Sequence, residues 1–268
     1  MSEEKNYIGI FDSGIGGLTV LKEIKEKMPM ENLIYFGDTA HLPYGTKSAS
    51  QIQEFAYNDV KFLSKFHLKA LVIACNTADS VARDMLEKSF DLPIYGVIEP
   101  AAKKAAELTK NKRVGVMATS ATVNSEAYQK KIKKYDSSVE VFPIACPLLV
   151  PLVENQRYRK DDQVVRLIVQ EYLDKLFIHD VDTIVLGCTH YPLLNEVIKD
   201  LSPNIQIISS SLAAAETLEA SLKEKGLCSE NEEREIRYYV SDDAMHFKEN
   251  ASIYTGENSE IEVEQVTI

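Results

Sequence analysis

Two cysteines stand where a thiol could carry out acid–base chemistry. Cys75 follows the apolar run Leu71-Val-Ile-Ala74 and precedes Asn-Thr, and Cys188 follows Ile184-Val-Leu-Gly187 and precedes Thr-His. A free thiol has a pKa of about 8.5 and is little ionised at neutral pH, so neighbouring donors or a histidine decide its reactivity. His190, two residues after Cys188, is such a neighbour. The alternative for both cysteines is a small buried hydrophobe, which is the commonest role of a lone cysteine.

A glycine-rich turn, Asp12-Ser-Gly-Ile-Gly-Gly-Leu-Thr19, follows an apolar run and precedes a helical pattern. A dinucleotide-binding fingerprint would carry a third glycine where this sequence has Thr19, and an aspartate in the turn would repel a pyrophosphate. The N–H groups at the start of a helix still attract an anion. We therefore expect the turn to meet the carboxylate of an amino acid, with Asp12 facing the ammonium group or a proton in transit.

The other two cysteines lack such neighbours. Cys146 lies in Ala-Cys-Pro and Cys228 in a charged segment, so we predict structural roles for both. The four cysteines form no CxxC pair, and the five histidines are not at zinc-ligand spacing. We expect free thiols, with neither a disulfide framework nor a metal site.

Alternating strands and helices would position these residues. The alternation predicts βα units with parallel sheets. Lys223–Arg234 reads as a surface loop, and Glu235–Val240 and Glu260–Ile268 as late strands at a sheet edge. The predicted strands are Tyr7–Phe11, Leu33–Phe36, Ala70–Ala74, Ile94–Ile98, Arg113–Met117, Val139–Phe142, Thr183–Leu186 and Ile205–Ile208, and the helices include Thr19–Lys27, Ser48–Lys65, Thr77–Lys88, Pro100–Thr109, Ser125–Lys133 and Asp161–Leu176.

The two halves of the chain repeat one pattern. Ile8-Gly-Ile-Phe-Asp-Ser-Gly14 resembles Val114-Gly-Val-Met-Ala-Thr-Ser120, and each half contains a strand that ends in a cysteine. We predict an α/β fold of two pseudo-symmetric domains with largely parallel sheets facing a central cleft. Residues 1–97 with 208–268 would form the first domain and residues 98–207 the second. Because ligands bind at the carboxyl ends of parallel strands, Cys75 and Cys188 would point into the cleft from opposite sides.

Composition excludes other classes of protein. The net charge is −11 without a basic run, which argues against nucleic acid as a partner. No run approaches the roughly 18 apolar residues that span a bilayer, so we expect no membrane partner. The N-terminal residues are polar and acidic, unlike a signal peptide, and we expect a cytoplasmic protein.

The sequence resembles the cofactor-independent glutamate racemases of the aspartate/glutamate racemase family. The similar strings occur in order as far as about residue 194, and the similarity weakens after Ile208, where the chain reads Ser209-Ser-Ser-Leu. They are Phe11-Asp-Ser-Gly-Ile-Gly-Gly-Leu-Thr-Val20, Tyr35-Phe-Gly-Asp-Thr-Ala-His-Leu-Pro-Tyr-Gly45, Ala74-Cys-Asn-Thr-Ala78, Gly96-Val-Ile-Glu-Pro100, Ala118-Thr-Ser-Ala-Thr122, Cys146-Pro-Leu-Leu-Val-Pro-Leu-Val-Glu154 and Leu186-Gly-Cys-Thr-His-Tyr-Pro-Leu193.

The resemblance implies a role for individual residues. Cys75 and Cys188 match the two catalytic thiols, and Asp12 and His190 match catalytic residues that assist them and contact the substrate. Asp38 and Glu154 match supporting positions, although ordinary capping or ion-pairing carboxylates are the alternative. The positions matched to substrate binding are Ser13, Tyr44, Gly45, Asn76, Thr77 and Thr189, together with Thr119 and Thr122.

The resemblance also implies interconversion of L- and D-glutamate for peptidoglycan synthesis without a cofactor, and it suggests a homodimer. Cys75 would serve the D-face of the substrate and Cys188 the L-face. Two alternatives stay open: a racemase of aspartate or another amino acid with the same two thiols, and a non-catalytic protein that keeps the fold and modulates a partner.

Overall fold

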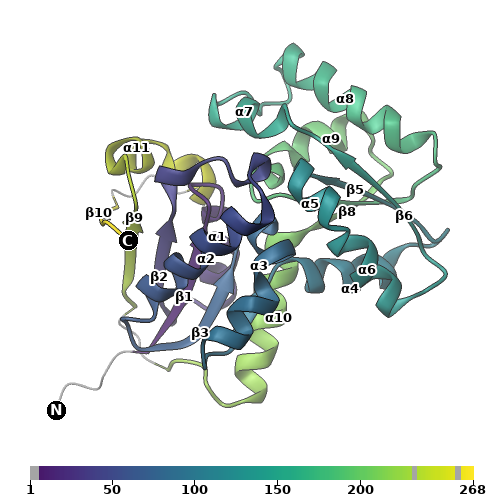
Figure 1. The fold of residues 1–268 in the computed structure, drawn as a ribbon. Coiled ribbons are helices and arrows are strands. Elements are labelled where there is room, and N and C mark those ends of the chain that lie inside the picture. The colour runs from purple at the N-terminus through teal and green to yellow at the C-terminus, as the bar shows by residue number, and fades with distance from the viewer. Residues whose placement is uncertain (1–5, 231–233, 257–260) are drawn as a thin grey trace.

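The protein consists of two α/β domains, each built around a parallel sheet (Figure 1). The computed structural model describes residues 6–230, 234–256 and 261–268. Every strand pair in both sheets is parallel, so the predicted fold class is confirmed. Sheet A has the order β10-β9-β2-β1-β3-β4, and its strands are β1 (Tyr7–Asp12), β2 (Asn32–Gly37), β3 (Leu68–Ile73), β4 (Ile94–Gly96), β9 (Ile236–Val240) and β10 (Val263–Gln265). Sheet B has the order β6-β5-β7-β8, and its strands are β5 (Arg113–Ala118), β6 (Glu140–Ala145), β7 (Thr183–Gly187) and β8 (Gln206–Ser209).

The strand orders reveal the internal repeat. The segment β2-β1-β3-β4 of sheet A has the same connectivity as β6-β5-β7-β8 of sheet B, so β1 corresponds to β5 and β3 to β7. A glycine lies in each central strand, Gly9 in β1 and Gly115 in β5. A β-carbon there would lie 2.9 Å from a leucine methyl group in each case, of Leu68 and Leu176 respectively. The predicted repeat is therefore confirmed by topology.

Helices flank the sheets and cover their apolar faces (Figure 1). β1 and β7 are buried along their whole length, which explains why their sequences consist mostly of consecutive apolar residues. The sequence predicted α1 (Leu18–Lys27), α2 (Ala49–Leu63), α3 (Asn76–Ser89), α4 (Ile98–Leu108), α6 (Ala127–Tyr135) and α8 (Gln163–Phe177). It did not predict α5 (Ser120–Ser125), α7 (Leu149–Glu154), α9 (Asn195–Leu201), α10 (Ser210–Glu224), α11 (Ala244–Thr255) or the 3₁₀ turns η1 (Thr39–His41), η2 (Tyr44–Thr46) and η3 (Tyr191–Leu194).

The C-terminal segments return to the first domain. β9 pairs with β2 and β10 with β9, which confirms the prediction of late edge strands; Glu260, in the predicted second segment, lies outside the described residues. The loop predicted for Lys223–Arg234 starts later than expected, because α10 continues to Glu224 and Gly226 follows with a left-handed φ of 66°. Residues 231–233 of that loop also lie outside the described residues.

The division at 97/98 and 207/208 stays a prediction. The strands nearest to these boundaries are β4, which ends at Gly96, and β8, which ends at Ser209. No helix in the described part of the chain is long and apolar enough to cross a bilayer.

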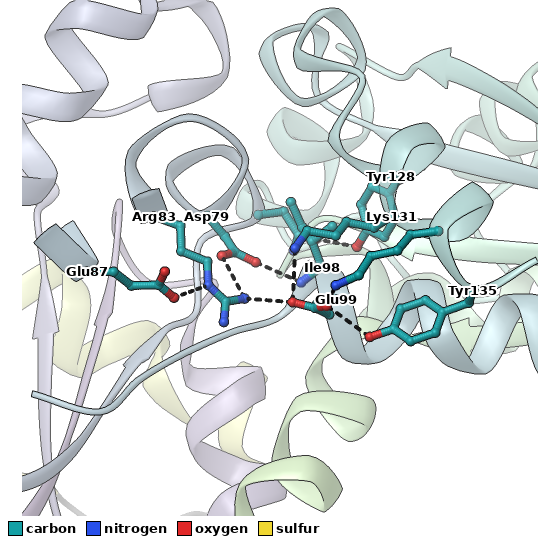
Figure 2. A network of polar contacts seen from close by, with 10 residues as sticks. Asp79, Arg83, Glu87, Ile98, Glu99, Tyr128, Lys131 and Tyr135 are labelled. Carbon is teal, nitrogen blue, oxygen red and sulfur yellow. Dashed lines mark hydrogen bonds and ion pairs between the residues drawn. The ribbon is translucent and has the colours of Figure 1, made fainter. Parts of the chain in front are cut away.

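A polar network joins the domains where β4 leads into α4 (Figure 2). Asp79 of α3 is buried and accepts a hydrogen bond of 2.8 Å from the backbone N–H of Ile98. Arg83 lies 3.8 Å from both Asp79 and Glu99. Glu99 also accepts a hydrogen bond of 3.0 Å from Lys131 of α6. Burial raises the pKa of Glu99, but hydrogen bonds from Lys131 and its neighbours outweigh burial and lower the pKa to about 2.

This network predicts the effect of a methyl group at Gly96. A β-carbon at Gly96 would lie 2.0 Å from an Asp79 carboxylate oxygen, and Asp79 is fixed by its hydrogen bond to Ile98. We expect Gly96→Ala to lower the free energy of unfolding in urea by about 1–3 kcal/mol. Gly115→Ala is the matched control, because only flexible leucine methyl groups oppose it, and its loss should be smaller. Equal losses in both variants would contradict this explanation.

Candidate functional site

A cavity of about 240 Å³ opens where the two sheets present the carboxyl ends of their strands. Cys75 lies two residues after the end of β3 as the N-cap of α3, and Cys188 directly follows β7, so the repeated strands bring both thiols to one cavity. The predicted residues in its lining are Ser13, Tyr44, Gly45, Cys75, Asn76, Thr77, Thr119, Glu154, Cys188, Thr189 and His190. Asp12 lies beneath this lining, fully buried, and Thr122 is likewise buried behind Thr77.

Asp12 is held by the turn that follows it. One of its carboxylate oxygens accepts hydrogen bonds from the N–H groups of Gly14, at 3.1 Å, and Gly17, at 3.0 Å. We expected these N–H groups to meet a substrate anion, but at Gly14 and Gly17 they are occupied by the protein's own carboxylate. The other oxygen of Asp12 has no hydrogen-bond partner among the described residues.

The Cys75 thiol lies in an electronegative, buried environment. Its sulfur is 3.6 Å from the Ser13 hydroxyl and accepts a hydrogen bond from the N–H of Ala78 at 3.5 Å. Burial, followed by the negative charge of Asp12, raises the pKa of Cys75 to about 12. Cys75 is therefore a protonated thiol at neutral pH, suited to donate a proton.

The Cys188 thiol has a different neighbour. Its sulfur lies 3.9 Å from Nδ1 of His190, and Nε2 of the same ring lies 3.1 Å from a carboxylate oxygen of Glu154. Burial lowers the pKa of His190, but the interactions with Cys188 and Glu154 outweigh burial and raise the pKa to about 10. The imidazolium can thus donate to both neighbours and favours negative charge on the Cys188 sulfur.

The glycine turn of the first domain also packs against the second thiol's segment. A β-carbon at Gly16 would lie 2.5 Å from the side chains of Thr189 and His190. Thr19 donates to the carbonyl oxygen of Thr189 at 2.9 Å and lies 3.0 Å from the hydroxyl of Ser211. Glycine is needed at position 16 because the side chains of Thr189 and His190 occupy the space that a β-carbon would take.

A cluster of hydroxyl groups spans the domains beside the cavity. Thr77 Oγ1 lies 2.9 Å from Thr119 Oγ1 and 3.3 Å from Thr122 Oγ1. Hydroxyl groups can donate or accept, so this cluster could bind a carboxylate or an ammonium group.

Asn76 is anchored by residues that the sequence did not single out. Its side-chain oxygen accepts a hydrogen bond of 2.6 Å from Tyr128, and its nitrogen donates to Ser210 at 3.3 Å. Ser210 in turn donates to the carbonyl oxygen of Leu186, near the end of β7. The Ser209–Ser211 segment therefore links Asn76 to the strand that carries Cys188, a link that local sequence does not reveal.

Tyr44 forms part of the wall but its hydroxyl is engaged elsewhere. It lies 2.6 Å from Asp38 Oδ2 and 3.1 Å from Asp59 Oδ2, and all three residues are buried. At the adjacent Gly45, a β-carbon would lie 3.0 Å from Thr119. Asp38 also accepts a hydrogen bond of 2.7 Å from Ser241, so it supports the wall from behind.

The remaining cysteines differ in location. Cys146 is buried and also lines the cavity, whereas Cys228 is half-buried outside it. All four cysteines are free thiols. Within the ranges that the structure describes, no group of three or more His, Cys, Asp or Glu side chains could hold a metal ion.

Comparison with known proteins assigns the family. A family model described as Asp/Glu/Hydantoin racemase matches residues 10–218. The chain belongs to this racemase family. It is therefore an isomerase, and its paired cavity thiols lie in a racemase fold.

Individual relatives of this racemase are similar over most of their length. Glutamate racemase from Sulfurihydrogenibium sp. (strain YO3AOP1) is 48% identical over 79% of this chain and 81% of its own. The solved structure of glutamate racemase isoform RacE1 from Bacillus anthracis has a TM-score of 0.94 at 37% identity, covering 99% of both chains. Glutamate racemase from Francisella tularensis subsp. tularensis SCHU S4, solved in complex with D-glutamate, has a TM-score of 0.91 at 36% identity, covering 99% of this chain and 98% of its own.

The unlike surroundings of the two thiols predict unlike reactivity. At pH 7 we expect iodoacetamide to alkylate Cys188 at least about tenfold faster than Cys75, since the thiolate is the nucleophile and the raised pKa of Cys75 suppresses it. Peptide mapping by mass spectrometry measures both rates in one sample. His190→Asn should slow alkylation of Cys188 and leave Cys75 little changed. Faster alkylation of Cys75 at pH 7 would contradict the described electrostatics.

The contact between His190 and Glu154 predicts a titration. In NMR spectra the His190 imidazole should titrate near pH 10, and Glu154→Gln should lower this pKa because it removes a negative charge beside the ring. Since the folded-state pKa lies above the ordinary value of about 6.5, the interaction stabilises the fold fully below that pH. This stability is lost as pH rises through about 10. His190→Asn assigns the signal, and Glu196→Gln, an exposed carboxylate on α9, should leave it unshifted.

Proposed function

We propose that this racemase interconverts L- and D-glutamate by a two-base mechanism with Cys75 and Cys188. The observation that carries the proposal is the pair of thiols on one cavity with opposite electrostatic neighbours, a carboxylate beside Cys75 and an imidazolium beside Cys188. Glutamate as substrate rests on the relatives named glutamate racemase, and especially on the similar Francisella enzyme solved with D-glutamate.

The reaction needs a proton acceptor and a proton donor on opposite faces of one carbon. In the L-to-D direction, the Cys188 thiolate removes the Cα proton of L-glutamate, and the electron pair of the C–H bond spreads into the α-carboxylate. The Cys75 thiol then delivers its proton to the other face, which gives D-glutamate and a Cys75 thiolate. The reverse reaction uses the same two groups in the opposite protonation states. The assignment of faces follows the family resemblance.

The surroundings of the thiols suit these roles. Burial and then the charge of Asp12 keep Cys75 protonated, as a proton donor must be. The imidazolium of His190 supports a thiolate at Cys188. The carbanion is a high-energy intermediate, and donors that are already oriented in a buried cavity can stabilise its charge. In this proposal Asn76, Thr77 and Thr189 supply those donors, and no cofactor takes part.

Three broader assignments accompany the proposal. D-glutamate would serve peptidoglycan synthesis, as the family resemblance implies. A cytoplasmic location agrees with four free thiols, which persist in reducing compartments. A homodimer also follows from the resemblance, and sedimentation analysis tests it.

The alternatives differ in measurable ways. A racemase specific for aspartate would turn over aspartate faster than glutamate in parallel circular dichroism assays. A non-catalytic modulator would turn over neither. Glutamate racemisation that disappears on alkylation of the thiols supports the proposal.

Solvent deuterium tests the two-base geometry. When D-glutamate is converted in D₂O, Cys75 takes the substrate proton and Cys188 supplies a hydrogen that has exchanged with solvent. Newly formed L-glutamate should therefore carry almost complete deuterium at the earliest conversion, and the remaining D-glutamate should carry little. The mirror result should hold when the reaction starts from L-glutamate. Mass spectrometry of the separated enantiomers measures both.

A single base serving both faces would give another result, because it would carry substrate protium into the product. Substantial protium in early product, in either direction, would rule out paired thiols. Cys75→Ser and Cys188→Ser should each lower kcat at least about 100-fold, because a serine hydroxyl is a much weaker acid than a thiol. Cys228→Ser, outside the cavity, is the matched control and should retain activity.

A further inference from the structure

The hydroxyl group of Tyr44 lies between the carboxyl groups of Asp38 and Asp59. Its single hydrogen atom cannot form a hydrogen bond with both groups if both are ionised. Its hydroxyl oxygen lies 2.6 Å from Asp38 Oδ2 and 3.1 Å from Asp59 Oδ2. A phenol has one hydrogen and can donate it to one acceptor at a time. The shorter distance assigns that hydrogen to Asp38, so the contact with Asp59 lacks a hydrogen unless Asp59 carries one.

The surroundings of the two carboxyl groups differ. Asp38 Oδ1 accepts a hydrogen bond from Ser241 at 2.7 Å and lies 2.8 Å from Nδ1 of His41, so its negative charge is well supported. Asp59 is fully buried, and its Oδ1 has no hydrogen-bond partner among the described residues. Asp59 also forms no ion pair with any residue that the structure describes. An isolated buried carboxylate is costly, and such a group takes up a proton instead.

We propose that Asp59 is a positioning residue: as a neutral carboxylic acid it donates a hydrogen bond to Tyr44, which donates to Asp38, and this chain fixes the cavity wall at residues 42–46. The kinetic consequence rests on the proposed racemase function, whereas the protonation of Asp59 does not. Burial and then the nearby charge of Asp38 raise the pKa of Asp59, in agreement with a neutral group.

The wall depends on a single face of α2. Phe55 and Asp59 are four residues apart on that helix and therefore project on the same side. The Phe55 ring stacks on His41 at 4.1 Å and tilts against Tyr44 at 5.6 Å. Phe55 thus holds the ring of Tyr44, while Asp59 holds its hydroxyl.

The held segment is part of the cavity itself. Residues 42–46 all line the cavity, and Gly45 approaches Thr119 so closely that a β-carbon would lie 3.0 Å away. Thr119 belongs to the hydroxyl cluster with Thr77. A shift of Tyr44 would therefore widen the cavity beside the cluster that we propose binds substrate.

A pair of substitutions separates the hydrogen bond from the charge. Asp59→Asn keeps a donor of nearly the same shape, so its KM for glutamate should stay within about twofold of wild type. Asp59→Leu removes the donor, and we expect KM to rise about tenfold while kcat changes less than about threefold. Urea unfolding of both variants confirms that they fold. An equal rise of KM in both variants, or no rise in Asp59→Leu, would overturn the positioning role.

Infrared difference spectroscopy tests the protonation without any turnover. The spectrum of wild type minus Asp59→Asn, at pH 7, should contain the C=O band of a protonated carboxylic acid, and this band should shift in D₂O. If Asp59→Leu fails to fold and its KM cannot be measured, Tyr44→Phe gives a second test by infrared spectroscopy. Without the Tyr44 hydroxyl, which accepts the hydrogen bond from Asp59, the acid band should move to higher frequency. A difference spectrum with only carboxylate bands would overturn the inference. A wild type that does not racemise glutamate but shows the acid band would refute only the proposed function.

Discussion

The site depends on the interactions of one buried group, the carboxylate of Asp12. It is buried at the end of the central strand of sheet A, and burial raises its pKa while the charge of His190 and the backbone N–H groups oppose that rise. By accepting from Gly14 and Gly17, it folds the turn that follows β1. Burial, and after it the same charge, raises the pKa of the Cys75 thiol and keeps it protonated. The turn then places Gly16 against Thr189 and His190, so one carboxylate influences both thiols.

The two halves of the chain share a topology but differ in electrostatics. Corresponding strands bring Cys75 and Cys188 to one cavity. The thiol of Cys75 lies near the negative charge of buried Asp12, whereas that of Cys188 lies near the protonated ring of His190. A symmetric scaffold with asymmetric neighbours suits the reaction that we propose, because that reaction removes a proton from one face and returns one to the other. Glu154 maintains this difference, because its contact with His190 helps to keep the ring charged.

The strands, the parallel sheets and both thiols could be predicted from the sequence because local patterns encode them. Apolar runs such as that before Cys75 specify buried strands, and topology then brings their ends together. The helix α10 escaped prediction because it packs between α1 and α4 and therefore lacks a simple polar face. The contacts of Asp59 with Tyr44, and of Ser210 with Asn76, depend on tertiary packing between segments that carry no common motif. The prediction that the N–H groups of the glycine turn bind a substrate anion was wrong for Gly14 and Gly17, because these groups donate to Asp12.

The wall around Tyr44 depends on residues at the far end of the chain. Asp38 accepts from Ser241, and Thr39 and Asp242 bond to each other through side chain and backbone, so segments about 200 positions apart complete one structure. Strand β9, which pairs with β2, belongs to the same late segment. Ser241 and β9 follow the strands of sheet B along the chain, so during synthesis the first domain is completed only after the second domain has been made. A chain that stops before Ser241 holds both thiols but lacks the hydroxyl that supports Asp38 behind the cavity wall, so the reactive groups are made before the wall that surrounds them is complete.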